Sequence, residues 1–403
     1  MQTAAESTTA SDRLIFLDWA RIGAFGLLVL YHVGMYYVSW DWHVKSPFAS
    51  TALEPWMRLS NPWRMSLLFI VSGVASAALL ARPGPVMRQR SKRLLLPLLF
   101  GVAVLVPPQT YFEVVQKGGY GGSYIEFLRL YFSAYHGFCR GSACLVLPTW
   151  NHLWFLVYLW LYTLLLWALL RAWPQALDRL ASVVAHALRC WRLLVLPIVF
   201  LALARVALYG RFGSTHALVD DWYNHAIYLP LFVLGAILAK RRELFDRMAE
   251  WRWPALAAAL AGWALLNVYL DASTPPAAAN EALRLVMRCV WAAVQWLALV
   301  AVLGFARRHL NRDHRWRAAL TDAVFPVYLL HQTLIILGAV ALRPLGWAPA
   351  VEGPLLVAFT LATSLAVWAL ARRIAWLRPW FGIARGPTRQ PDVAGSLVAA
   401  VRG

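Results

Sequence analysis

Long apolar runs recur along this chain, and they limit what it can fold into. Each is about 17 to 25 residues long, which as a helix matches the hydrocarbon thickness of a bilayer. Composition agrees, because 61% of the residues are hydrophobic and only 14% are charged. The sequence therefore predicts an all-α, polytopic membrane protein with about ten transmembrane helices: 14–38, 65–81, 94–110, 150–170, 193–210, 223–239, 253–270, 283–306, 319–341 and 354–371.

Basic residues are concentrated in alternate connections between these spans. Most of the 38 Lys and Arg lie in 1–13, 82–93, 171–192, 240–252, 307–318 and 372–403. The positive-inside rule assigns these segments, and hence both termini, to the cytoplasm. This bias accounts for most of the net charge of +19, so we expect no nucleic-acid partner.

The same pattern divides the chain into three parts. We expect a cytoplasmic segment at 1–13, a transmembrane domain at 14–371 and a disordered cytoplasmic tail at 372–403. The polar start lacks a basic region, so the first span is expected to serve as its own targeting signal. Segments 39–64 and 111–149 are expected to be outer loops, and spans seven to ten, which lack polar clusters, a scaffold.

Two of the four cysteines, Cys139 and Cys144, lie in the run GFCRGSAC of the outer segment 111–149. The outer side of a cell membrane is an oxidising compartment that permits disulfides, and the sequence leaves open whether these two are bridged. No Cys/His spacing resembles a metal site, and we expect no metal.

Arg21 and His32 bracket the run RIGAFGLLVLYH in the first span. Their spacing places both side chains on nearly the same helix face, about 16 Å apart along the axis. One interpretation is structural: Arg21 pairs with Asp18 and His32 is an interfacial histidine. The other is chemical, because ionisable groups within a membrane are costly and usually functional. In that case His32 is a general base and Arg21 holds an anion.

Five short motifs, in order, resemble those of the acyltransferase-3 family of integral membrane enzymes. LDWARIGAFGLLVLYH resembles the family's opening motif, with an Arg and a His separated by ten residues, and Phe69–Gly73 (FIVSG) resembles FFxxSG. Arg90 and Arg93 form an RxxR element, His152–Phe155 reads HLWF, and VYLLHQTLI contains Tyr328 and His331. One departure is that the second span has LLFIVSG where a phenylalanine pair is usual.

The resemblance implies a multi-pass enzyme of the bacterial inner membrane and a role for each matched residue. The implied catalytic residues are His32, Arg21 and Asp18. Guanidinium groups bind phosphate bidentately, so Arg88, Arg90 and Arg93 are expected to hold the 3′-phosphate and pyrophosphate of acyl-CoA. Ser72 and Gly73 let another helix or a substrate chain approach closely. The expected substrate-binding residues are Arg64, His152, Trp154, Tyr328 and His331.

Each of these roles has a plainer alternative. The basic segment 82–93 is also what the positive-inside rule produces, and His152 is also placed as an interfacial anchor. Arg64 at the outer end of its span is also placed to snorkel to the interface. Arg284 and Arg288 share a helix face near the outer end of the eighth span. They are alternative anion ligands, although pairing with Asp271 or Glu281 is the simpler explanation.

Four further runs resemble family members that succinylate osmoregulated periplasmic glucans: Trp42–Ser46, Arg64–Met65, His152–Leu156 and Leu229–Ala236. The likeness implies succinyl-CoA as donor substrate, no bound cofactor, and membrane lipid, a periplasmic glucan and glucan synthesis proteins as partners. O-acetylation of another surface polysaccharide is the alternative within the family. A secondary transporter or a scaffold is the alternative outside it, although transporters usually show repeats or broken helices, and no repeat is visible.

Overall fold

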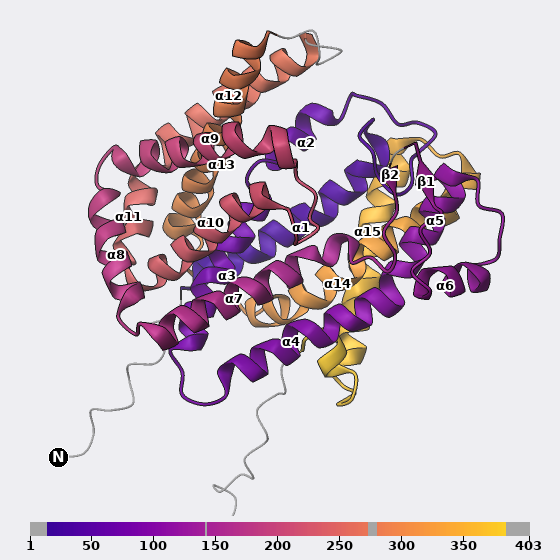
Figure 1. Cartoon of the computed structure of the whole chain (residues 1–403), viewed down its shortest axis with the longest axis horizontal. Helices are drawn as coiled ribbons and strands as arrows, with labels where there is room; N and C mark the ends of the chain where they lie inside the picture. The colour runs from indigo at the N-terminus through magenta and orange to yellow at the C-terminus, as the bar shows by residue number, and fades with distance from the viewer. Residues whose placement is uncertain (1–13, 142, 273–279, 384–403) are drawn as a thin grey trace, which may run out of the picture.

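The computed structural model describes residues 14–141, 143–272 and 280–383. Over these ranges the chain is helical apart from its connections and one two-stranded hairpin (Figure 1). Ten helical stretches are long and apolar enough to cross a membrane, which confirms the all-α polytopic fold.

The spans agree closely with the apolar runs. They are α1 (Ile15–Tyr37), α3 (Arg64–Leu80), α4 (Val86–Phe100) continued by η1 (Gly101–Leu105) and α5 (Val106–Gly118), α7 (Trp154–Ala172), α9 (Arg192–Phe212), α10 (Trp222–Lys240), α12 (Arg252–Ala272), α13 (Glu281–His309), α14 (Arg317–Leu342) and α15 (Pro349–Ala371). Shorter elements join them: α2 (Glu54–Ser60), α6 (Tyr124–Phe132), β1 (Cys139–Arg140), β2 (Ala143–Cys144), η2 (Asn151–Leu153), α8 (Ala176–Ala187), α11 (Glu243–Glu250), η4 (Arg343–Leu345) and η5 (Arg378–Phe381).

The two expected outer loops contain more structure than their sequences suggested. Segment 39–64 includes α2, and segment 111–149 includes the end of α5, α6 and the β1–β2 hairpin, which a Cys139–Cys144 disulfide closes. The Lys45 ammonium donates to the backbone carbonyls of Met35 (2.7 Å), Val38 and Trp40 (3.0 Å), which satisfies the carboxyl end of α1. Burial lowers the pKa of Lys45.

The basic segment 82–93 is also not a loop, because α4 begins at Val86. Arg90 and Arg93 therefore lie three residues apart on one helix face. Farther along, the chain passes through a π-helical turn at Gly101–Leu105. Such turns leave backbone carbonyls without regular partners. Here side chains supply the donors: Tyr131 donates to the carbonyl of Val102 (2.9 Å) and Thr333 to that of Leu105 (2.8 Å).

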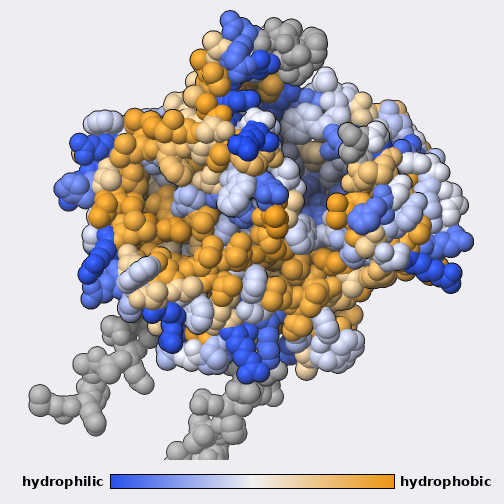
Figure 2. Space-filling view, viewed as in Figure 1, coloured by the Kyte–Doolittle hydropathy of each residue, from blue (hydrophilic) through white to orange (hydrophobic). Residues whose placement is uncertain are grey.

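The helix α14 lies at the centre of the bundle. In its most apolar window 78% of the residues are buried, against 17% for α9 and 22% for both α12 and α15, which lie at the periphery. The expectation that span nine is only scaffold is therefore wrong, because α14 carries the buried polar residues His331, Gln332 and Thr333. Figure 2 shows the hydrophobic surface as a broad band, with hydrophilic residues gathered beyond it.

Close packing of α3 against α10 fixes the second span in place. A Cβ added at Gly73 would lie 1.9 Å from the Phe232 carbonyl oxygen, and one at Gly235 would lie 2.0 Å from that of Ile70. Glycine is required at both positions for the backbones to approach this closely. Of the two explanations for the small residues of FIVSG, the structure supports helix packing at Gly73.

Candidate active site

The helices α1 and α14 bring His32 and His331 together, although 299 positions separate them in the sequence. His32 Nδ1 lies 2.8 Å from His331 Nε2, and the two rings stack with centroids 4.9 Å apart. His331 is fully buried, whereas His32 is only partly buried. Of the pair, His32 is the residue that a substrate can reach.

The hydrogen bonds assign the protons of this pair. His331 Nδ1 lies 2.6 Å from the backbone carbonyl of Tyr328, which can only accept, so Nδ1 carries the hydrogen. In a neutral His331 the other nitrogen, Nε2, then accepts from His32 Nδ1–H. His32 is left with its lone pair on Nε2, which is the form a general base needs.

A second polar network surrounds the pair on its outer side. His152 donates to the Leu329 carbonyl (3.2 Å), and Tyr328 donates to the His152 carbonyl (2.7 Å). The His152 ring also meets the His331 ring edge-on at 5.1 Å. His152 and Tyr328 therefore hold η2, at the start of α7, against α14 beside His331.

The sequence analysis missed the rest of this network. Gln332 donates to Gln109 (3.0 Å) and to His43 Nε2 (2.8 Å), and His43 Nδ1–H donates to Glu113 (2.5 Å). Trp42, next to His43, lies nearly parallel to the His32 ring at 6.5 Å. Two sequence features could have pointed to these residues: Gln332 directly follows His331, and His43 lies in the run Trp42–Ser46.

Arg64 contributes a buried cation close to the pair. It is 4% exposed, its guanidinium lies 3.6 Å over the Tyr31 ring, and Nη1 donates to Ser60 (3.2 Å). Its Nε has no hydrogen-bond partner, and no carboxylate pairs with it in the described part of the chain. Arg64 is within electrostatic reach of both His32 and His331. It is buried rather than snorkelling to the interface.

At the other end of α1, Arg21 belongs to a cluster of cations. Arg21 reaches the Thr321 carbonyl (3.4 Å) and lies within electrostatic reach of Arg90, whose Nε is buried without a partner. Arg93 donates to the Gly382 carbonyl (3.1 Å), and Arg88 is exposed. Like charges brought this close favour a polyanionic ligand between them.

Asp18 is placed differently from the expectation. Its carboxylate pairs with Arg317 at 2.6 Å, whereas Arg21 is 4.0 Å away. Arg317 is in turn fixed by Asp313 (2.7 Å). Asp18 therefore joins α1 to α14 about 21 Å along the axis from His32, too far to touch the same reacting atoms.

The outer loop between α9 and α10 covers Trp154. The His216 ring stacks on Trp154 at 4.1 Å, and burial lowers the pKa of His216 to about 4. Burial alone would raise the pKa of Asp221, but hydrogen bonds from Tyr158, Asn224 (2.8 Å) and the Thr215 amide (3.2 Å) outweigh it and hold that pKa below its ordinary value. Ser72 is half-buried on α3.

No cluster of three or more His, Cys, Asp or Glu side chains is arranged to hold a metal ion within residues 14–141, 143–272 and 280–383.

Comparison with known proteins decides the family. The sequence model of the acyltransferase-3 family, described as an acyltransferase domain, matches residues 14–372. The chain belongs to this family. It is a multi-pass membrane acyltransferase by family and by its ten apolar helices.

Among curated proteins, the chain is similar to glucans biosynthesis protein C of Salmonella paratyphi B, Salmonella agona and Salmonella enteritidis. In each case the identity is 24% over 350 residues, covering 84% of this acyltransferase and 86% of its relative. No solved structure matches the chain significantly.

Proposed function

We propose that this acyltransferase moves an acyl group, succinyl in particular, from cytosolic acyl-CoA to a hydroxyl of a periplasmic glucan. The observation that carries the proposal is the His32–His331 pair. Its hydrogen bonds leave a lone pair on His32 Nε2, and of the two rings the His32 ring is the one that is partly exposed. The glucan is supported by the name of the similar proteins, glucans biosynthesis protein C. The bacterial inner membrane is the location this substrate pair requires.

The proposed step needs only groups that the chain supplies. His32 Nε2 takes the proton of the acceptor hydroxyl as that oxygen forms a bond to the thioester carbonyl carbon. The carbon–sulfur bond then breaks, and the proton on His32 passes to the leaving thiolate, so that CoA departs as the free thiol and His32 returns to its neutral form. The positive charge on His32 is stabilised by its Nδ1–H bond to His331, which the Tyr328 carbonyl orients in turn.

The two ends of α1 would bind different parts of the substrates: CoA near Arg21, and the thioester and the acceptor hydroxyl near His32. Arg21 lies about 16 Å from His32 along the helix, a distance that an extended pantetheine arm can cover. Arg88, Arg90, Arg93 and Arg21 would hold the CoA phosphates at the cytoplasmic end. A thioester delivered along α1 then arrives beside His32, where His152, Trp154 and Tyr328 shape the outer side.

Arg64 supports a dicarboxylic donor. A succinyl group brings a carboxylate into a low-dielectric site, where an unpaired charge costs several kcal/mol. Arg64 is a buried guanidinium with a vacant Nε close to His32, so it offers the matching cation. An acetyl donor, the alternative within the family, makes no use of it.

The proposal is tested with purified protein, labelled succinyl-CoA and a glucan acceptor. His32→Ala should lower transfer at least 100-fold while leaving CoA binding nearly intact, because only the proton-transfer group is removed. His186→Ala, on the exposed face of α8, is the matched control. Turnover near the wild-type rate in His32→Ala would exclude His32 from the chemistry. If the wild-type protein released no CoA when glucan was added, the result would instead favour the transporter alternative.

A further inference from the structure

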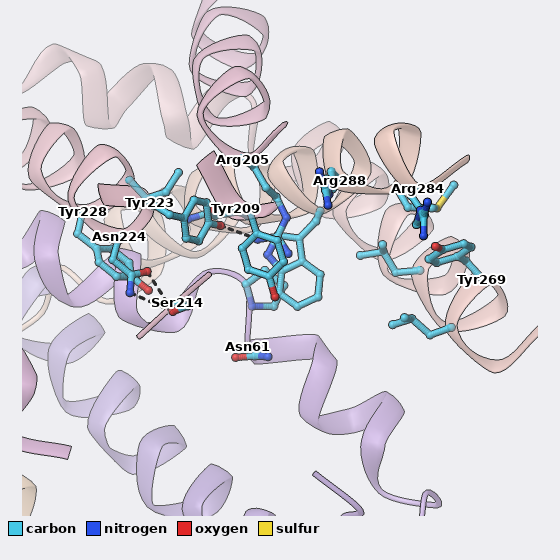
Figure 3. A pocket seen from close by; sticks show the side chains of 17 residues that line it. Asn61, Arg205, Tyr209, Ser214, Tyr223, Asn224, Tyr228, Tyr269, Arg284 and Arg288 are labelled. Carbon is cyan, nitrogen blue, oxygen red and sulfur yellow. Dashed lines mark hydrogen bonds between the residues drawn. The ribbon is translucent and has the colours of Figure 1, made fainter. Parts of the chain in front are cut away.

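A cavity of about 410 Å³ opens between α9, α10, α12 and α13, away from the histidine pair (Figure 3). The charge bias assigns this end of the helices to the periplasm. Three guanidinium groups face the cavity from two helices: Arg205 on α9, and Arg284 and Arg288 on α13. None of them takes part in the proposed transfer step.

Arg205 is the most enclosed of the three. It is 9% exposed and lies among three aromatic rings: Trp291 (4.6 Å), Tyr209 (4.4 Å) and Tyr223 (5.7 Å). Nη1 donates to the Tyr223 hydroxyl (2.5 Å), but Nε is buried without a hydrogen-bond partner. A desolvated guanidinium normally has an anion beside it.

Carboxylates do not balance these cations. Arg284 pairs with Glu281 on its own helix, whereas no described carboxylate pairs with Arg205 or Arg288. Arg288 lies across from α9, within 3.3 Å of the position of a Cβ added at Gly210. The cavity therefore keeps two guanidinium groups for a ligand, and a bidentate anion fits that geometry.

The remaining walls suit a sugar. The rings of Tyr209, Tyr228, Tyr269 and Trp291 offer flat apolar faces, while the side chains of Ser214 and Asn224 offer hydrogen-bonding groups. The aliphatic side chains of Ile227, Leu266, Leu270 and Met287 complete the lining, and the phosphatidylglycerol experiment described below tests whether a lipid headgroup binds there instead.

The cavity is connected to the surroundings of the histidine pair through aromatic contacts of Tyr228. Tyr228 lines the cavity, stacks on Phe69 at 4.7 Å and meets Trp154 at 5.7 Å. Tyr228 is also within electrostatic reach of both Arg205 and Arg64. From Trp154, ring contacts continue through Phe155 to Tyr328, whose carbonyl holds His331.

We propose that this cavity binds an anionic substituent, a phosphate or a carboxylate, on a sugar of the glycan acceptor. The inference rests on the proposed function, because it identifies the acceptor of that reaction as a glycan that already carries negative charge. Arg205 and Arg288 hold the anion, and the aromatic walls hold the sugar that carries it.

The test measures binding without any acyl donor. Purified protein in phosphatidylcholine nanodiscs is titrated with a glucan hexasaccharide and with the same hexasaccharide carrying one phosphate monoester. The phosphorylated probe should bind at least tenfold more tightly. Arg288→Gln should remove this preference, whereas Arg211→Gln, an exposed cation near the end of α9, should keep it. Equal affinity for the two probes, or an equal preference in Arg288→Gln, would overturn the proposal.

Two further experiments distinguish the glycan site from a lipid headgroup site, and a failure of this inference from a failure of the proposed function. In nanodiscs containing phosphatidylglycerol, a loss of probe binding in the wild type but not in Arg288→Gln would identify a lipid headgroup site and overturn the glycan assignment. His32→Ala should retain the full preference for the phosphorylated probe. In the wild-type protein, a preference for the phosphorylated probe without any acyl transfer would count against the proposed function alone, and acyl transfer without that preference would count against the cavity alone.

Discussion

At the scale of single residues, the site depends on one carbonyl. The backbone oxygen of Tyr328 fixes the tautomer of His331, and His331 fixes that of His32. The arrangement has the logic of a nucleophile–base–orienter chain, with neutral groups in place of the carboxylate. His331 is therefore a positioning residue whose value lies in accepting one hydrogen bond.

This reasoning predicts different results for two substitutions at His331. His331→Leu should lower kcat by about 100-fold with little change in KM, because His32 loses the acceptor that orients it. His331→Gln should recover much of that loss, since an amide oxygen also accepts from Nδ1–H. Steady-state kinetics of both variants with one donor provides the measurement. Equal losses would mean that the position matters only for packing.

A second prediction concerns Arg64 and the choice of donor. Arg64→Met should reduce kcat/KM for succinyl-CoA on the order of 100-fold, the loss expected when a buried charge loses its partner. The same variant should use acetyl-CoA as well as the wild type does, or better. Because both donors are measured with the same variant, differences in expression or in the folded fraction affect the two values equally. A parallel fall for both donors would show that Arg64 supports the fold or the acceptor.

At the scale of elements, most of the basic segment 82–93 is the first part of the helix α4 and not a loop. Arg90 and Arg93 share that face, and Arg90 lies near Arg21 of α1. Replacing both by Gln should weaken binding of CoA much more than that of 3′-dephospho-CoA. Lys92→Gln, an exposed charge on the same helix, is the control. If the two ligands lose affinity equally, the arginines serve topology and do not bind the phosphate.

The sequence was sufficient for the spans and for the motif residues, because both depend on local patterns. Apolar runs of fixed length identified all ten spans, and the family motifs identified His32, His152, Tyr328 and His331. What could not be predicted depends on contacts between distant segments. The pairing of Asp18 with Arg317 and the placement of Arg205 in an aromatic cavity are both of this kind.

At the scale of the whole molecule, acid should act first on the outer loop 213–221. The pKa of His216 is about 4 in the folded protein and near 6.5 in an unfolded chain. Between these values the unfolded chain binds more protons, so stability should fall as the pH falls from 6.5 to 4. The lowered pKa of Asp221 adds a further loss at still lower pH, below the ordinary pKa of an aspartate, because the unfolded chain protonates first there.

The apparent melting temperature, measured from pH 7.5 to 4.5 in detergent, checks this expectation. His216→Asn removes the titrating ring and tolerates the left-handed backbone at this position, where φ is +59°. The variant should show a weaker dependence of melting temperature on pH than the wild type. An unchanged dependence would mean that other groups determine the acid sensitivity.

The central position of α14 also has a consequence for biosynthesis. At roughly 5–20 residues per second, the 299 positions between His32 and His331 correspond to about 15–60 s of translation. During that interval α1 resides in the membrane with its histidine unmatched, while the contact between Tyr31 and Arg64 forms early. The His32–His331 pair is among the last contacts to form, so a chain interrupted before the ninth span inserts most of its helices and yet lacks the proposed active site.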